Sequence, residues 1–325
     1  MASSALTSTA TAILTSARAS PQDLYSLKTV HCYRAYGLNI GSALPLPELT
    51  RAEGSIEVRV RIDELRASTR PPAGKVAWKD GSDIYLFWPE LGIFRVRAGR
   101  EIVVCPTAGV SEGALRPPIL GICMAVLLHQ RGLLVMHASA SVVGKGAIAF
   151  LGDKGWGKST TNAALHQRGH AFITDDILSI DLQPSLPAVY PAFPQMKLWP
   201  SAVTALGDNP QNLPKLLPHL EKRQHLFESD IAQQSAPIKA LYVLGKGPAL
   251  SIQRLPHREI LGHLFRHSYS GRCGKDLLQH GETAHFLQCM TLARKVPTYQ
   301  LQRPSNLGEL DAIAQAIESH ARSID

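Results

Sequence analysis

A run of eight residues near the middle of the chain has the pattern of a phosphate-binding loop. Residues 152–159 read Gly-Asp-Lys-Gly-Trp-Gly-Lys-Ser and match G-x-x-x-x-G-K-S at every defined position. In such a loop the lysine, here Lys158, reaches the β- and γ-phosphates, and the serine hydroxyl, here Ser159, ligates Mg²⁺. The residues predicted to bind a nucleoside triphosphate are Gly152, Asp153, Lys154, Gly155, Trp156, Gly157, Lys158, Ser159 and Thr160.

The residues on either side supply the elements that this loop needs. The apolar stretch Ala147 to Leu151 predicts a buried strand, and residues 158–168 contain neither Gly nor Pro before Gly169, which predicts a helix that ends there. Glycines let successive backbone N–H groups turn toward a phosphate, and the helix N-terminus adds its partial positive charge. Strand, loop and helix are therefore predicted in the order that phosphate binding requires.

Two adjacent carboxylates, Asp175 and Asp176, follow the next predicted strand, residues 170–174. Ligands of α/β sheets bind at the carboxyl ends of strands, so we expect both side chains near the loop. One carboxylate would face water bound to a metal, and the other would face an acceptor hydroxyl. A surface turn is the structural alternative for this pair, and Asp181 is an alternative metal carboxylate.

His137 lies in the apolar sequence Val-Met-His-Ala-Ser, residues 135–139. From these residues alone, a core histidine with satisfied hydrogen bonds and a functional histidine both stay open.

Composition narrows the class of protein. The chain has 325 residues, a formal net charge of +8 and 45% hydrophobic residues, which describes a soluble globular protein with anionic partners. Aromatic residues make up only 6% and no Cys/His finger spacing occurs, so nucleic-acid binding is disfavoured. The apolar run 119–128 is too short to span a membrane. Five scattered cysteines without a C-x-x-C pair favour a reducing cytoplasm and predict no zinc site.

The chain is predicted to have three parts. Residues 1–27, rich in Ala, Ser and Thr, are predicted to form a disordered tail rather than a transit peptide, because no Arg-bearing amphipathic face develops. Residues 28–115 are predicted to form a small antiparallel β-rich domain, and residues 116–325 an α/β catalytic domain. The strands predicted in the N-terminal domain are 56–62, 83–88, 92–96 and 101–104.

In the larger part, Pro117 and Pro118 predict the start of a helix that ends near Gly132. One long strand is predicted over 133–143, and the Pro-rich residues 183–218 are predicted to be irregular. The elements predicted beyond them are a strand at 238–244, helices at 257–268 and 275–295, a strand at 298–302 and a final helix capped by Ser305 or Asn306.

Several of these residues carry a resemblance to a known family. The segment from Leu133 to Asp181 resembles the kinase domain of the HPr kinase/phosphorylase family. The matching marks are Met-His-Ala-Ser at 136–139, the loop in the form G-D-x-G-x-G-K-S, Arg-Gly-His at 168–170 and the pair Asp175-Asp176. Shorter matches resemble the HPr-kinase-like serine kinases, some of which phosphorylate ribosomally made precursor peptides such as lasso peptides. These matches are residues 36–38, 44–49, 128–132 and 197–199.

The resemblance implies a fold and an activity. The fold would be an α/β P-loop kinase core of the HPr kinase/phosphoenolpyruvate carboxykinase type, preceded by the small β-rich domain. The activity would be transfer of the γ-phosphoryl group of ATP, with Mg²⁺, to a serine hydroxyl of a peptide or protein. Asp175 would then act as the base, Asp176 would lie with Ser159 near the metal, and His137 would lie beside the transferred phosphate. The family also implies a homo-oligomer.

The sequence departs from the family at one signature. The Pro-Gly-Arg core of the bacterial enzymes is absent, and the nearest run, residues 254–258, lacks the Gly, so HPr itself is not implied as the substrate. A nucleotide-gated regulatory protein and a small-molecule kinase or carboxykinase stay open as alternatives. A GTPase is disfavoured because no Asn-Lys-x-Asp motif occurs. Among the basic residues past 220, Arg223 and Arg258 are predicted to contact substrate or phosphate, the alternative being solvated helix faces.

Overall fold

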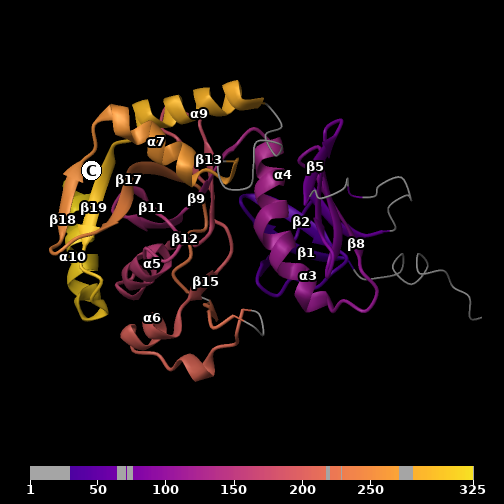
Figure 1. Cartoon of the computed structure of the whole chain (residues 1–325), viewed down its shortest axis with the longest axis horizontal. Helices are drawn as coiled ribbons and strands as arrows, with labels where there is room; N and C mark the ends of the chain where they lie inside the picture. The colour runs from indigo at the N-terminus through magenta and orange to yellow at the C-terminus, as the bar shows by residue number, and fades with distance from the viewer. Residues whose placement is uncertain are drawn as a thin grey trace, which may run out of the picture.

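The computed structural model describes residues 30–63, 71, 76–216, 220–227, 229–270 and 281–324. They form a mixed α/β protein with two large sheets, which lie side by side in Figure 1. The predicted tail, residues 1–27, and the start of the helix predicted over 275–295 lie outside the described residues. Among the described residues, no helix combines the length and the apolar character that a membrane crossing would need.

The N-terminal sheet has eight strands in the order β3-β1-β2-β4-β8-β7-β6-β5. Their bounds are β1 His31–Ala35, β2 Leu38–Ser42, β3 Thr50–Arg51, β4 Val58–Ile62, β5 Ala77–Asp80, β6 Asp83–Trp88, β7 Gly92–Arg97 and β8 Glu101–Pro106. The prediction of an antiparallel sheet was wrong for β4, which runs parallel to both β2 and β8. Alternation of apolar and charged residues identifies a strand, but it does not encode the direction of its neighbours.

A helix interrupted by a wider turn covers this sheet. It consists of α3 Glu112–Pro118, a π-helical turn η1 Ile119–Cys123 and α4 Met124–Gln130. The helix therefore begins five residues before the predicted start, and the two prolines lie in the last turn of α3. Proline lacks an N–H and its ring crowds the carbonyl four residues back, so the regular ladder cannot continue, and Gly121 takes non-helical angles of φ −94° and ψ −110°.

The same helix bears on the predicted boundary at residue 115. Leu115, Ile119 and Leu127 are buried in one cluster with Ile40 and Phe94 of the N-terminal sheet. Figure 1 shows α4 between the two sheets, and the same cluster includes Val135 of β9 and Ile177 of β13 from the second sheet. Residues 112–130 thus pack against both sheets, and the boundary at residue 115 stays a prediction.

The second sheet has nine strands and helices on both faces. Its order is β12-β10-β11-β17-β14-β13-β9, with β19 beside β17 and β18 beside β19. The strand bounds are β9 Leu134–His137, β10 Ser139–Val143, β11 Gly146–Leu151, β12 Phe172–Thr174, β13 Ile177–Asp181, β14 Ala188–Val189, β17 Ala236–Lys246, β18 Ser251–Arg254 and β19 Thr298–Arg303. β11, β17 and β19 are parallel to one another, so their carboxyl ends meet at one edge.

The helices described in this part are α5 Lys158–Gln167, α6 Pro200–Ala205, α7 His257–His267, α9 Gly281–Lys295 and α10 Leu310–Ser323. β11 is buried on both faces, because Ala147 and Ala149 lie in the cluster with α7 and α9 while Ile148 and Phe150 lie in the cluster with α5 and α10. A continuous apolar run is what a strand covered on both sides requires.

Other predictions differ from the structure in detail. The single strand predicted over 133–143 is split at Ala138 into β9 and β10, which pair with different neighbours. The region predicted to be irregular contains β14, β15 Gln195–Leu198, α6 and the 3₁₀ turn η2 Pro210–Asn212, and β15 pairs with β16 Arg223–Leu226. Asn306, predicted as a cap of the final helix, caps η4 Leu307–Glu309, the 3₁₀ turn that leads into α10, and its side chain accepts from Gly308 N; the N-cap of α10 itself is Glu309, which makes no side-chain cap bond.

Candidate functional site

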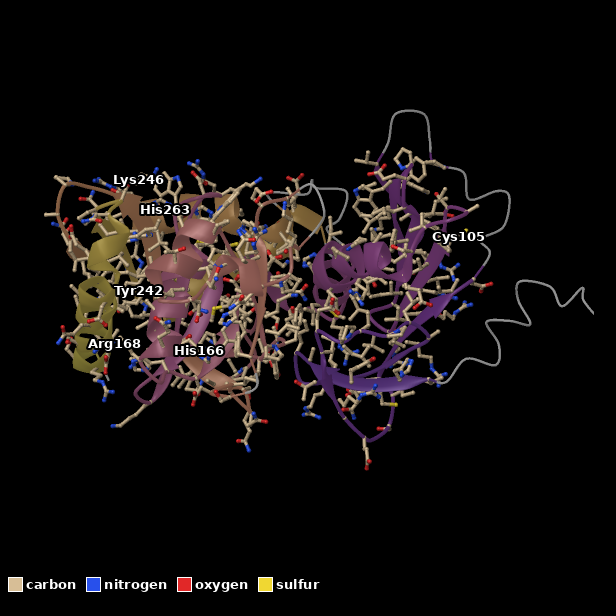
Figure 2. The ribbon with its side chains drawn as sticks, turned by 90° about the horizontal axis from the view of Figure 1, so that it is seen from below. Cys105, His166, Arg168, Tyr242, Lys246 and His263 are labelled. Atoms are coloured by element: carbon tan, nitrogen blue, oxygen red, sulfur yellow. The ribbon has the colours of Figure 1, made fainter. Side chains whose placement is uncertain are left out.

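The loop that the sequence predicts to bind phosphate, residues 152–159, joins β11 to α5, in the predicted order of strand, loop and helix. Gly155 and Gly157 adopt left-handed φ values of +84° and +86°, which residues with a side chain rarely take. Gly157 occupies the N-cap position of α5, so Lys158 and Ser159 begin the helix. In Figure 2 Lys246, which ends β17, lies at one end of the strands with His263 of α7, whereas Arg168, at the far end of α5, lies at the other. The N-terminus of α5 therefore points toward the edge where the parallel strands end.

The ammonium of Lys158 is buried inside the loop. Its Nζ donates to the carbonyl oxygens of Gly152 at 2.8 Å and Asp153 at 3.3 Å. The Asp153 carboxylate faces outward and pairs with Arg266 of α7. A fixed positive charge beside a helix N-terminus is the arrangement that holds a polyphosphate.

Asp175 is buried at the end of β12 and is held by several hydrogen bonds. Ser139 Oγ donates to one carboxylate oxygen and Lys197 N to the other, each at 2.9 Å. The Ser159 side chain lies close enough to this carboxylate to lower its pKa. Burial raises the pKa of Asp175, and the Lys197 N–H with the hydroxyls of Ser159 and Ser139 only partly opposes that rise. The loop serine therefore meets Asp175, whereas the sequence resemblance paired it with Asp176.

Asp176 has a different environment, with 28% of its side chain exposed. His137 Nδ1 and Lys197 Nζ each lie 2.9 Å from its oxygens, and the Tyr269 hydroxyl donates at 3.1 Å. Burial alone would raise the pKa of Asp176, but Lys197 and His137 outweigh it and hold that pKa well below its usual range. The split at Ala138 places His137 at the end of β9, opposite Ile177, and so within reach of Asp176.

These groups line one pocket of about 600 Å³. It contains the loop from Lys154 to Thr160, both aspartates, His137 and Lys197, and it extends to the interrupted helix at Pro117, Gly121 and Ile122. Trp156 also lines it while its ring packs, half-buried, against the cluster beneath α5 and α10. Of the predicted nucleotide residues, Gly152 and Asp153 form the base of the loop and do not line the pocket.

Arg303, which was not predicted from the sequence, lies at the carboxyl end of β19 and lines the same pocket. It is 7% exposed, its Nη2 donates to Trp156 O at 3.2 Å, and its Nε is buried without a hydrogen-bond partner in the structure. A Cβ on Gly157 would lie only 1.9 Å from Nη2, so the glycine leaves the space that the guanidinium occupies. The strand 298–302 was predicted, but its parallel placement next to β17 has no local sequence signal.

The two arginines predicted to contact substrate lie elsewhere. Arg223 is 5% exposed in β16, where Nε donates to Pro210 O at 2.8 Å and Nη1 to Glu221 O at 3.1 Å. Those bonds hold a loop, and Arg223 does not line the pocket. Arg258 on α7 has 85% of its side chain exposed beside Glu259, which matches the solvated helix face that was its alternative. The carboxylate of Asp181 accepts from Gln183 N and Tyr190 Oη, so it too lies outside the pocket.

Among the residues that the structure describes, no group of three or more His, Cys, Asp or Glu could hold a metal ion. Mg²⁺ at a phosphate loop does not need such a group, because waters and phosphate oxygens complete its coordination. The Ser159 hydroxyl and the Asp175 carboxylate are hard oxygen donors in contact with each other, and they fit that requirement.

No protein-family model matches the chain, and no curated protein matches it in sequence. One similar solved structure is the Hpr(Ser) kinase/phosphatase from Coxiella burnetii, with 12% identity over 58% of this chain and 88% of that chain. The TM-score is 0.31, at which the likeness supports no conclusion about fold or function.

Proposed function

We propose that the protein is a kinase that transfers the γ-phosphoryl group of ATP to a serine hydroxyl of a peptide or protein, with Mg²⁺ as cofactor. The observation that carries the proposal is the meeting of a phosphate-binding ammonium and a pair of unlike carboxylates in one pocket. Phosphoryl transfer needs little more than positioning of the phosphates, charge stabilisation and a group that accepts the acceptor's proton. A lasso-type precursor peptide and a homo-oligomer stay predictions of the sequence resemblance, and a cytoplasmic location stays a prediction of the cysteine pattern.

On the nucleotide side, Lys158 would bind the β- and γ-phosphates and the loop N–H groups would surround them. Arg303 adds a second cation there. Its burial without a carboxylate partner among the described residues is costly unless an anion approaches, and burial already lowers its pKa. Ser159 and Asp175 would hold Mg²⁺, which when bound neutralises charge that develops on the phosphate oxygens.

On the acceptor side, the contacts favour Asp176 over Asp175 as the proton acceptor. Both carboxylates have several hydrogen-bond partners, but Asp175 is buried, whereas Asp176 is more exposed to the pocket. The low pKa of Asp176 keeps it ionised at neutral pH, so it can accept a hydrogen bond from the acceptor hydroxyl and then its proton. His137 fixes the orientation of that carboxylate. This proposal reverses the division of roles that the sequence resemblance implied.

The test is incubation of the purified chain with ATP, Mg²⁺ and a library of serine-containing peptides. The expected result is one added phosphoryl group on a subset of peptides, detected by mass spectrometry, and its loss when Mg²⁺ is chelated. Tight ATP binding without transfer to any acceptor, with no free phosphate released, would favour a nucleotide-gated regulatory protein instead.

A further inference from the structure

Resting on the proposed kinase activity, we infer that the acceptor is itself an anion, with a carboxylate near the reacting hydroxyl, and that Lys222 on the face of Trp199 binds this carboxylate. The chemical class is a hydroxyl compound with neighbouring acidic groups, such as a serine within an acidic stretch of peptide.

The pocket carries an excess of positive charge. Its described lining contains six cations, Lys154, Lys158, Lys197, Lys222, Lys246 and Arg303, against two carboxylates. ATP with one Mg²⁺ brings about two negative charges, so it offsets only part of the excess of four. A pocket that keeps net positive charge with its nucleotide bound favours an anionic second substrate and disfavours a cationic one.

Lys222 is partly buried against an aromatic ring. Its ammonium lies 5.7 Å from the centre of the Trp199 ring, and it has no carboxylate partner among the described residues. Burial lowers the pKa of Lys222; Asp175 and Asp176 raise it, while Lys197 and Lys154 lower it. This partly desolvated charge is therefore held by a ring face and balanced only by two aspartates that have closer partners.

Lys222 lies beside different strands from the cations that flank the phosphate loop. Trp199 follows β15, the strand whose Lys197 binds both aspartates, and Lys222 precedes the paired strand β16. Arg303 and Lys246 instead end β19 and β17, the strands beside the phosphate loop strand β11. The antiparallel pair β15–β16 thus places Lys222 close enough to Asp175 and Asp176 to interact with both charges, and Trp199, 44% exposed, supplies an open flat surface beside it.

The experiment compares matched serine peptides that differ only in flanking Glu, Gln or Lys, together with malate as a small hydroxy acid. We expect kcat/KM to be about tenfold to a hundredfold higher for the Glu peptide than for the Gln peptide, the range that a hydrogen bond to a charged group provides. Lys222→Gln should remove this preference and leave the KM for ATP unchanged, and Lys222→Glu should reverse it toward the Lys peptide. Calorimetric affinity for the Glu peptide, with a non-hydrolysable ATP analogue bound, should fall in parallel.

Lys145→Gln is the matched control, because Lys145 is exposed in the turn between β10 and β11 and lies outside the pocket. Phosphorylation of malate but of no peptide would support an anionic acceptor of the small-molecule kind. Equal transfer to all three peptides would overturn the inference while leaving the kinase proposal intact. A raised KM for ATP in Lys222→Gln, with the acidic preference kept, would assign Lys222 to the nucleotide and overturn its role here. Absence of transfer to every acceptor would overturn both proposals.

Discussion

At the scale of single residues, the two adjacent aspartates are chemically different groups. One is buried with a raised pKa and touches the loop serine, and the other pairs with Lys197 and His137 and has a lowered pKa. The sequence places both near the loop, because they end a strand that follows the loop helix. It does not tell them apart, because the distinction comes from Lys197, which is twenty-one residues or more away along the chain.

The first prediction concerns Lys158. Lys158→Ala should lower phosphoryl transfer on the order of a thousandfold and weaken ATP binding, because the main fixed charge on the β- and γ-phosphates is removed. Single-turnover rates and calorimetric ATP binding measure the two effects, with circular dichroism to establish that the variant folds. Near-normal transfer by the folded variant would contradict the phosphate-loop assignment.

The second prediction separates the aspartates. Asp176→Asn should retain Mg²⁺-dependent ATP affinity and lose about 10²–10⁴-fold in transfer, since a proton acceptor is removed. Asp175→Asn should instead weaken the Mg²⁺ dependence of ATP binding, because it removes a metal ligand. Titration of each variant with Mg²⁺ at fixed ATP gives the comparison. If Asp175→Asn abolishes transfer with normal Mg²⁺ affinity, Asp175 is the base.

At the scale of elements, the loop and β19 fit together through one glycine. The strand-loop-helix unit could be predicted from the apolar run before the loop and the Gly-free segment after it. The contact between Arg303 and the loop could not, because the order of parallel strands depends on packing over the whole sheet. The start of the interrupted helix was also predicted wrongly. Pro117 and Pro118 were predicted to be its first residues, but they lie in the last turn of α3, which begins at Glu112.

The third prediction tests that contact with a pair of glycines. Gly157→Ala and Gly169→Ala both place a side chain at φ near +85°, so each should destabilise the fold by about 1 kcal/mol or more. Only Gly157→Ala also collides with Arg303, since nothing lies within 4 Å of a Cβ at Gly169. ATP affinity should therefore fall in Gly157→Ala alone. Equal ATP affinity in the two variants would show that the guanidinium position is unimportant for the nucleotide.

At the scale of the whole molecule, Asp176 connects distant parts of the chain. Its carboxylate joins β9 through His137, β15 through Lys197 and the segment after α7 through Tyr269. Because its pKa is lowered by folding, the stability it contributes is present above about pH 4 and is lost as the pH falls through the lower folded pKa. The pKa of Asp175 is instead raised by folding. The ionised form of Asp175 therefore destabilises the folded state, and this destabilisation disappears when Asp175 is protonated.

The fourth prediction concerns how the opposite pKa shifts of Asp176 and Asp175 make the stability of the fold depend on pH. At pH 7 Asp176→Asn should lower the free energy of unfolding by about 1–3 kcal/mol, because Lys197 loses its charged partner. The difference from the wild type should shrink as the pH is lowered below about 4. Asp175→Asn should show a smaller loss or a gain at pH 7. Chemical denaturation at several pH values measures both. A pH-independent difference for Asp176→Asn would exclude ionisation of Asp176 as its source.

Lys197 binds Asp175 through its backbone N–H and Asp176 through its side-chain ammonium. A substitution at position 197 therefore affects the two aspartates differently. Asp176 depends on the ammonium, so a single codon change at position 197 can retune its acidity over a wide range. Asp175 depends on the backbone N–H, which every amino acid except proline retains. Substitution at this position can therefore vary the group proposed to face the acceptor while Asp175 keeps that hydrogen bond, so chemistry at the proposed acceptor site can diverge without the proposed metal site having to be rebuilt.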